Sequence, residues 1–280
     1  ILFFEVIRLR MVEISKKYKL ETKSFGLINW IGFWTLYKKE VLRFFNVIGQ
    51  TILGPIMTAG LFLLVISLAI GEGRSDILGV SYINFLFPGL IAMQFLIQAF
   101  SHSSSSLLMG KVMGNIVDMI SAPLSSLEVT MAIILASVTR SFIIAAVSII
   151  VFTFFLNIQI DNIFYVLIYL FLGSFVLGAV GFITGLWAEK FDNMSTVTNF
   201  VITPFVFLSG SFYSIDKLPK FLQIISEYNP FFYMIDGFRY GFIGNSDGSI
   251  TFGLIYLSLL CIITWFVSYI LYKKGYKIKS

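Results

Sequence analysis

The sequence predicts an all-α integral membrane protein. We expect six transmembrane helices, an N-terminal interfacial amphipathic helix, and short re-entrant helices between spans 5 and 6. Composition is the first reason: hydrophobic residues make up 58% of the 280 positions and charged residues only 12%, against about 45–50% and about 25% in soluble domains. The mean hydropathy is accordingly high, at +0.90. Long apolar runs and a gathering of basic residues at both ends of the chain are the other two reasons.

Six apolar runs reach or approach the roughly 20 residues that an α-helix needs to cross a bilayer. The expected spans are Ile48–Ile70, Tyr82–Met109, Val129–Leu156, Ile163–Trp187, Val197–Tyr213 and Ile250–Tyr272. No linker or low-complexity tract separates them. We therefore expect residues 29–280 to form one membrane domain that follows an N-terminal segment of residues 1–28.

Basic residues determine the expected orientation. Nine of the twenty Lys and Arg precede the first span and four more close the chain, and the positive-inside rule places such segments in the cytoplasm. We expect a multi-pass membrane protein with both termini cytoplasmic; the resemblance given below implies that the membrane is the bacterial inner membrane. The basic residues are not interleaved with aromatics on a soluble surface, so no nucleic-acid partner is expected. Met11 is a candidate start, which leaves open whether residues 1–10 belong to the native protein.

Residues 29–46 have the pattern of an amphipathic helix. Aromatic and aliphatic residues, among them Trp30, Trp34 and Phe44, recur every three or four positions. The opposite face carries Lys38, Lys39, Glu40, Arg43 and Asn46. A helix with aromatic residues on one side and basic residues on the other is suited to the membrane interface. A cytoplasmic helix packed on protein is the alternative.

The inward-facing loop Gly110–Glu128 is expected to contain a short helix that Pro123 ends. A second compact loop, Ala188–Thr196, faces the same side. Short ordered segments between spans are suited to contact a partner protein in the cytoplasm. Ordinary connectors have the same composition, so both readings stay open on composition alone.

Few residues suggest catalysis. The sequence has no Gly-rich phosphate loop of the Walker type, so we expect no nucleotide to bind this chain. The single histidine, His102, lies in the second span without a nucleophile motif, which leaves helix packing or a contact with cargo. Arg140 lies inside the third span, where a charge costs at least about 2.5–3.5 kcal/mol. It therefore either pairs structurally or meets an anionic substrate. The single cysteine, Cys261, is expected to pack in the membrane domain.

Residues 214–244 are too apolar for a solvated loop and too interrupted for a span. Ile215–Ile225 fits one helical face, and Asn229-Pro230 breaks that helix before a second one. Two short helices that enter the outer leaflet and return fit this pattern, provided that protein or water covers the irregular backbone.

Asp236 and Arg239 are three residues apart and are expected to pair across one helical turn. If the pair is structural, reversing both charges should rescue the export that either single reversal abolishes. If the double reversal stays inactive, the inference is that Arg239 contacts cargo or another part of a gate.

The stretch "PFVFLSGSFYSIDKLPKFLQIISEYNPFFYMIDGFRYGFIG" (Pro204–Gly244) resembles the C-terminal signature of type-2 ATP-binding-cassette (ABC) exporter permeases. That signature has an aromatic-rich "FLSG" turn, then "LP", then "NP" followed by spaced Tyr, Asp, Arg and Gly. The segments Phe87–Gln94 and Asn115–Glu128 are similar to the same family. The resemblance covers nearly the whole chain after Trp30.

The resemblance implies the membrane subunit of an ABC exporter, which forms a dimer and binds two copies of a separate ATPase. ATP and Mg would bind to that ATPase, and no cofactor is expected in this chain. Members of the family export lipid-linked polysaccharides, lipo-oligosaccharides, drugs or other lipids. An ion-coupled secondary carrier and a membrane enzyme acting on lipids are the alternatives from other classes.

The site predictions form three groups. Residues expected to couple to the ATPase are Lys38, Glu40, Arg43, Lys111, Asn115 and Asp118. Residues expected to form an outer gate are Leu208, Gly210, Phe212, Pro219, Asn229, Pro230, Asp236 and Arg239. Arg140 and His102 are expected on the transport pathway.

Overall fold

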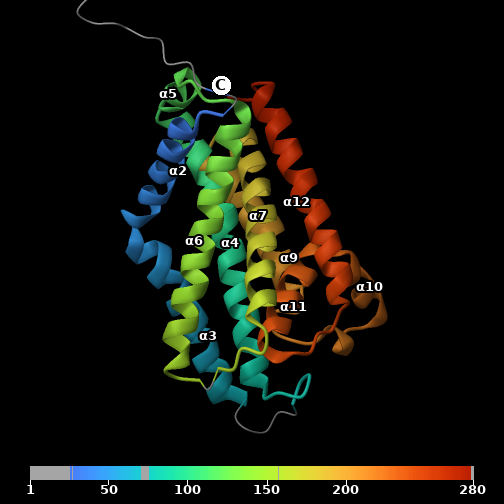
Figure 1. Ribbon diagram of the computed structural model, residues 1–280. Helices are drawn as coiled ribbons and strands as arrows, with labels where there is room; N and C mark the ends of the chain where they lie inside the picture. Colours follow the sequence, from blue (N-terminus) through green and yellow to red (C-terminus); the bar gives the residue numbers. More distant parts are fainter. Residues whose placement is uncertain (1–25, 27, 71–75, 157, 279–280) are drawn as a thin grey trace, which may run out of the picture.

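The computed structural model describes residues 26, 28–70, 76–156 and 158–278. They form an elongated bundle of helices, shown in Figure 1. The described part of the chain contains no β-strand, only an isolated bridge between Ile77 and Val80. The expectation for residues 1–28 falls almost entirely outside the described residues, as does the question of whether residues 1–10 are native.

Five helices of the described chain are long and apolar enough to cross a membrane. They are α3 (Gly54–Ile70, preceded by the π-helical turn Gly49–Leu53), α4 (Tyr82–Val112), α6 (Ser126–Thr153), α7 (Ile163–Trp187) and α12 (Ile250–Lys273). The fold class is thus confirmed, and five of the six expected spans are present. The third begins three residues earlier than expected, because Ser125 and Glu128 form a capping box that starts the helix at Ser126.

The expected fifth span, Val197–Tyr213, is helical only as far as Phe207. The chain forms an unbroken helical segment of α8 (Phe191–Val197), a π-helical turn (Thr198–Ile202) and α9 (Thr203–Phe207). The helical segment therefore begins six residues earlier and ends six residues earlier than expected. It ends because the following backbone turns at Gly210, whose φ of +73° lies in the left-handed region that glycine adopts without strain. The count of six spans is not confirmed.

Both π-helical turns lie directly before a proline. In the first, the Gly54 N–H donates to the Gly49 carbonyl, and Pro55 follows. In the second, the Thr203 N–H donates to the Thr198 carbonyl, and Pro204 follows. A proline inside a helix cannot donate a hydrogen bond and crowds the carbonyl four residues earlier. A wider turn at that place lets the helix continue through the proline.

α4 is the central helix and packs against α3, α6, α7 and α11. Its closest approach is to α7, where glycines take the place of side chains. A Cβ atom on Gly181 would collide with the carbonyl of Phe100, and one on Gly185 would lie 2.8 Å from the carbonyl oxygen of Ser104. Small residues at such crossings let two membrane helices approach closely, so that dispersion contacts hold them together.

The segment after α9 folds back as two short helices, α10 (Lys220–Tyr228) and α11 (Pro230–Ile243), as expected. The break lies at Asn229-Pro230, where the Asn229 side chain accepts a hydrogen bond from the N–H of Phe231. The first helix begins only at Lys220, because Pro219 precedes it and residues 215–217 form a separate 3₁₀ turn. α11 is almost completely buried and packs on α4, α7 and α12.

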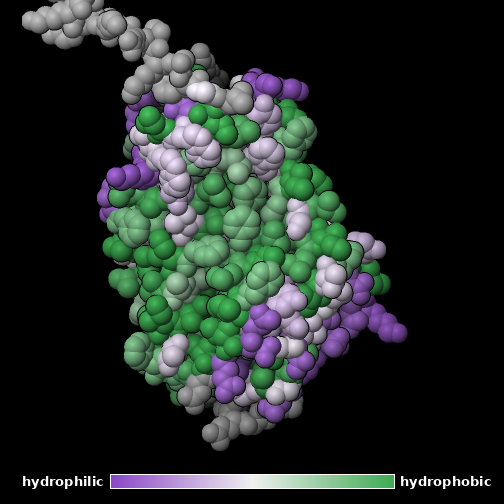
Figure 2. Space-filling view, viewed as in Figure 1, coloured by the Kyte–Doolittle hydropathy of each residue, from purple (hydrophilic) through white to green (hydrophobic). Residues whose placement is uncertain are grey.

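Figure 2 shows a broad hydrophobic surface over the middle of the bundle, with hydrophilic residues gathered toward its two ends. A helix bundle in a bilayer exposes its apolar side chains to lipid, so this surface agrees with the composition. One end carries α5 (Ile116–Ser121), the start of α2 (Trp30–Phe45) and the end of α12 (Figure 1). We call it the α5 end.

Candidate functional site

The inner face of α2 carries a charged residue that the sequence analysis placed outside. Leu36, Glu40 and Phe44 lie four residues apart and are the buried residues of this helix. The expectation that Glu40 shares the exposed basic face is therefore wrong, whereas Lys38 and Lys39 are exposed as expected. The carboxylate is tolerated inside because polar side chains of α4 surround it.

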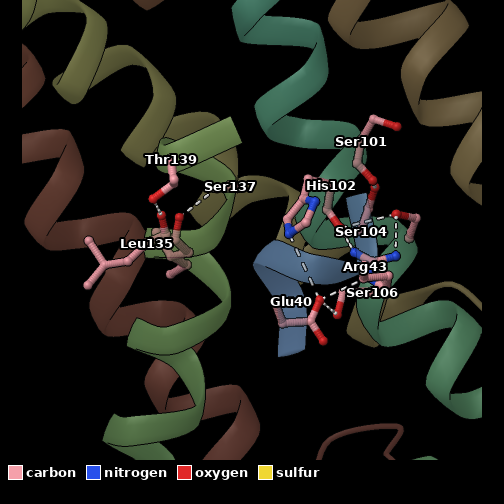
Figure 3. Close-up of polar contacts among 11 residues, drawn as sticks. Glu40, Arg43, Ser101, His102, Ser104, Ser106, Leu135, Ser137 and Thr139 are labelled. Carbon is pink, nitrogen blue, oxygen red and sulfur yellow. Dashed lines mark hydrogen bonds and ion pairs between the residues drawn. The ribbon is translucent and has the colours of Figure 1, made fainter. Parts of the chain in front are cut away.

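Glu40 joins α2 to α4 through hydrogen bonds (Figure 3). Its Oε2 atom accepts from the Ser106 hydroxyl at 2.7 Å and from Nε of Arg43 at 3.0 Å. Arg43 in turn donates through Nη2 to the carbonyl oxygen of His102 at 3.0 Å. Nε2 of His102 lies 3.9 Å from the Glu40 carboxylate. The two sequence predictions, ATPase coupling for α2 and pathway for His102, thus meet in one place.

Arg140 of α6 extends the same group of residues. It donates to the side-chain oxygen of Gln98 on α4. No described carboxylate lies within ion-pair distance of Arg140, and its Nε atom is buried without a hydrogen-bond partner. We call Glu40, Arg43, Gln98, His102, Ser106 and Arg140 the α2–α4–α6 cluster. It holds two guanidinium groups and one carboxylate.

A hydrogen-bonded joint fixes the α5 end of α2. The N–H of Asn29 donates to Oε1 of Glu128 at 2.5 Å, and the Asn29 side chain donates to the carbonyl of Pro123 at 3.0 Å. Glu128 also accepts from the N–H of Ser125 at 2.7 Å. The starts of α2 and α6 and the loop after α5 are therefore tied together, so they are expected to move as one unit.

The predicted residues of the loop around α5 differ in their surroundings. Asn115 and Asp118 are exposed. Lys111, at the end of α4, donates instead to the carbonyls of Leu186 at 2.7 Å and of Ala188. It therefore ties α4 to the end of α7 rather than standing free.

Near the hydrogen bonds of Lys111, an exposed ion pair joins the C-terminal segment to the loop after α7. Nζ of Lys277 lies 2.8 Å from Oε1 of Glu189. This hydrogen bond lowers the pKa of the Glu189 carboxyl below its ordinary value. The pair is solvated, so it contributes little to the cohesion of the α5 end.

A second group of charges lies at the opposite end of the bundle. Arg239 of α11 is 1% exposed and donates through Nη2 to the Gly210 carbonyl at 2.5 Å. Its Nη1 atom lies 3.9 Å from a carboxylate oxygen of Asp236 and equally far from one of Asp247. Its guanidinium carbon is 3.9 Å from the ring centroid of Phe85 on α4. We call these five residues the Arg239 cluster.

The carboxylates of the Arg239 cluster hold the neighbouring loops. Asp236 accepts from the N–H groups of Asp247 and Gly248 at 3.0 and 2.9 Å. Asp247 accepts from the Ser214 hydroxyl at 2.6 Å. The predicted pairing of Asp236 with Arg239 is therefore present, and it belongs to a larger network that closes the turn after α9.

The other predicted gate residues lie around this turn. Gly210 adopts a positive φ within it, and the carbonyl of Phe212 accepts from the Tyr82 hydroxyl at 2.9 Å. Asn229 donates to the Ser209 hydroxyl at 2.8 Å, which joins the start of α11 to the turn. Leu208, Pro219 and Pro230 belong to the same region, and Leu208 and Pro219 are exposed. Their role as an outer gate remains a prediction.

Four residues of the two clusters and of the contact between the starts of α2 and α6 were not predicted from the sequence. They are Gln98, Ser106, Glu128 and Asp247. Glu128 was recognisable, because Ser125 and Glu128 have the spacing of a capping box. The other three join segments far apart in the sequence, and no local pattern marks them.

Comparison with known proteins shows which family the chain belongs to. The protein-family model described as "ABC-2 type transporter" matches residues 31–243. The chain belongs to the ABC-2 type transporter family. It is 32% identical over 240 residues to the inner membrane transport permease YadH of Escherichia coli K12, and the alignment covers 84% of this chain and 94% of that protein.

Two nodulation proteins J are more distant relatives. The protein from Neorhizobium galegae is 22% identical over 250 residues, which cover 89% of this chain and 94% of the relative. The protein from Rhizobium leguminosarum bv. viciae is 24% identical over 246 residues, which cover 85% and 90%. The family and the apolar helices together make this ABC-2 chain a membrane permease subunit of an ABC transporter and a multi-pass inner-membrane protein.

Proposed function

We propose that this permease exports an amphipathic cargo, a lipid, lipid-linked glycan or drug, and that ATP hydrolysis in a separate ATPase subunit drives the export. The observation that carries the proposal is an apolar surface at the α5 end. Four apolar side chains around α5 are between 41% and 63% exposed: Val112, Met113, Val117 and Ile120. We call them the α5 surface. Exposed apolar side chains gathered beyond the end of a membrane bundle are typical of a protein contact site.

The joint behind the α5 surface supports coupling. Asn29 and Glu128 tie the loop after α5 to the starts of α2 and α6. A push on α5 therefore acts on α2, which Glu40 and Arg43 in turn connect to α4. In this proposal an ATPase dimer closes on ATP binding and moves α5, α2 and α4 relative to the rest of the bundle. The exposed Asn115 and Asp118 then lie at the contact.

The orientation and the assembly are part of the proposal. The basic ends of the chain support an orientation with both termini, and with them the α5 end, in the cytoplasm. Two copies of the permease would enclose a path between them, and two copies of the ATPase would bind below. ATP and Mg belong to the ATPase in this scheme.

The experiment is co-purification of the tagged permease with the ATPase encoded beside it. We expect Val117→Asp and Ile120→Asp to abolish co-purification, because each places a charge in an apolar contact. Ile160→Asp is the matched control, since Ile160 is 40% exposed in the loop between α6 and α7, away from α5. Unchanged co-purification of both α5 variants would refute the α5 surface as the docking site.

A secondary carrier is tested in the same preparation. Buried carboxylates such as Glu40 and Asp236 are typical of ion-coupled carriers, but in this chain both accept several hydrogen bonds. A permease that transports on an ion gradient without the ATPase would overturn the proposal.

A further inference from the structure

We propose that the α2–α4–α6 cluster is a binding site for the phosphate-type headgroup of an amphiphile, whose apolar chain lies in a groove between α3 and α6. This inference rests on the proposed function, because the amphiphile would be cargo. It assigns to Arg43 and Arg140 the task of binding the headgroup and to the groove the task of binding the chain.

Charge balance is the first argument. Glu40 is the only described carboxylate within 4 Å of Arg43, and Arg140 has none. His102 supplies no charge unless it is protonated, so the cluster carries one surplus positive charge. A phosphate-type anion between the two guanidinium groups would neutralise it, and guanidinium binds such anions through paired hydrogen bonds.

Unused hydrogen-bonding groups are the second argument. Nε of Arg140 and both ring nitrogens of His102 are buried without a hydrogen bond. Buried polar groups are paired in the great majority of cases, and an exception requires an explanation. His102 has no exposed surface, so bulk water does not pair its ring nitrogens. A headgroup oxygen beside Arg140 would accept from the free Nε–H.

The depth of Arg140 is the third argument. It lies in the middle of α6, which runs from Ser126 to Thr153, so it is about 20 Å from either end of that helix. A charge at this depth is too far from both surfaces to be hydrated at the membrane interface. An uncompensated arginine there is costly in the empty protein, and an anion in transit removes the cost.

Access to the cluster exists from the outside of the bundle. The side chain of Arg43 is 29% exposed, and Gln98 and Arg140 are partly exposed. Below the cluster, Ile52 and Ile56 pack against Ile144 and form the seam between the first span and α6. A headgroup at Arg140 therefore lies at the top of this seam.

An apolar groove opens farther along the same two helices. It has a volume of about 500 Å³ and is lined by Ile56, Gly60 and Leu64 of α3 and by Val151 and Phe152 of α6, among others. Val151 is eleven residues after Arg140 on α6, hence about 16 Å away. An acyl or prenyl chain reaches over that distance. The groove therefore favours an amphiphile over a free phosphate ion as the occupant.

The test measures binding to the permease alone, without ATPase or ATP. The probes are a fluorescent phosphatidic acid, the matching phosphatidylcholine analogue and inorganic phosphate, each titrated into permease in neutral detergent. We expect Arg140→Gln to weaken phosphatidic acid binding by about tenfold or more, the loss of one charge-assisted hydrogen bond. Arg140→Lys should restore part of it. Lys39→Gln, which removes an exposed charge from α2, is the control and should bind as the unchanged protein does.

A second variant tests the groove. A Cβ atom on Gly60 would meet only the Phe152 ring at 3.6 Å, an ordinary contact, so Gly60→Leu is expected to fold and to fill the groove. It should weaken phosphatidic acid binding and leave any binding of inorganic phosphate unchanged. Equal binding of both phospholipid analogues, or wild-type affinity in Arg140→Gln, would overturn the headgroup site. Wild-type affinity in Gly60→Leu would overturn the groove. Because no ATPase is present, these failures are separate from a failure of the proposed function.

Discussion

Two charged clusters lie inside this bundle, and they differ in how completely their charges are compensated. In the Arg239 cluster, one guanidinium faces two carboxylates, a backbone carbonyl and an aromatic ring, and it is 1% exposed. In the α2–α4–α6 cluster, the one carboxylate pairs with Arg43, and Arg140 binds only a neutral amide. Phe85 and His102, one from each cluster, are about 25 Å apart along α4.

This difference in compensation suggests that one cluster stabilises the fold and the other binds a ligand. Arg239 has two carboxylates beside it, although its Nε atom, like that of Arg140, is buried without a hydrogen bond. Losing one partner of such a buried ion group leaves the others uncompensated in an apolar environment. A charge that lacks a partner costs free energy until something binds to it. We therefore assign the Arg239 cluster to holding the turn after α9 and the α2–α4–α6 cluster to a ligand.

The largest expected effect comes from Arg239→Gln. It leaves Asp236 and Asp247 buried without their cation, which should lower the free energy of unfolding by about 3–5 kcal/mol. We expect a strongly reduced yield and a lower thermal unfolding temperature of the purified protein. Lys217→Ala, an exposed change near the same turn, should leave both unchanged. A stable Arg239→Gln protein that has lost only transport would place Arg239 on the pathway instead.

Reversing both charges sharpens this prediction. The sequence analysis expected rescue by the double reversal of Asp236 and Arg239 if the pair is structural. The structure predicts no rescue, because an arginine at position 236 would face the N–H groups of Asp247 and Gly248. An aspartate at 239 would face the Gly210 carbonyl. Thermal unfolding of the double variant distinguishes rescue from no rescue. Recovered stability would mean that Asp236 and Arg239 stabilise the protein as an isolated pair, without the rest of the network.

Glu40→Gln should have an intermediate effect on stability. The amide still accepts one hydrogen bond, but Arg43 loses the one described carboxylate beside it, which we expect to cost about 1–3 kcal/mol. Because Glu40 joins α2 to α4, the change should also weaken the coupling of ATP hydrolysis to transport. The measurement is ATP turnover per molecule exported, and an unchanged ratio would contradict the role of this contact.

Arg140→Gln should be the opposite of Arg239→Gln. Removing an arginine without a counter-ion should change the free energy of unfolding by less than about 1 kcal/mol, or raise it. Transport should nevertheless fall by about tenfold or more, since one charge-assisted hydrogen bond to the headgroup is lost. Thermal unfolding and transport are measured on the same preparation. A large loss of stability would make Arg140 a structural residue and remove the contrast between the clusters.

The smallest effect is expected from Lys277→Gln, which breaks an exposed pair. Glu189 has a pKa lowered by Lys277, so the pair stabilises the fold above the ordinary carboxyl pKa and stops doing so as the pH falls through the lowered value. Between pH 6 and 8 the pair is intact throughout. We therefore expect the unfolding temperatures of the variant and of the unchanged protein to differ by the same small amount at every pH in this range.

Long-range contacts explain what the sequence could and could not predict. The spans at α4 and α7 follow from apolar length alone, and the break at Asn229-Pro230 follows from local turn chemistry. The bounds of the fifth span were wrong because the helical segment begins at Phe191 and ends at Phe207, before the turn at Gly210, whereas the apolar run continues beyond that turn.

The charged clusters are harder to predict. Glu40 has the spacing of the buried residues Leu36 and Phe44, but its charge suggested the solvent face. The partners that keep it inside lie on α4, more than sixty residues away in the sequence. The pair Asp236 and Arg239 was found because it is local, whereas Asp247 was not.

In the proposed function, ATP hydrolysis in a separate ATPase drives outward transport through this chain. The most direct measurement is the flux of a fluorescent phosphate-bearing amphiphile across sealed vesicles that contain the permease and the ATPase, with ATP on the ATPase side only. We predict a flux that requires ATP and disappears in Ile120→Asp, whose α5 surface no longer binds the ATPase. A flux that persists without the ATPase and collapses when an uncoupler dissipates the ion gradient would contradict the claim.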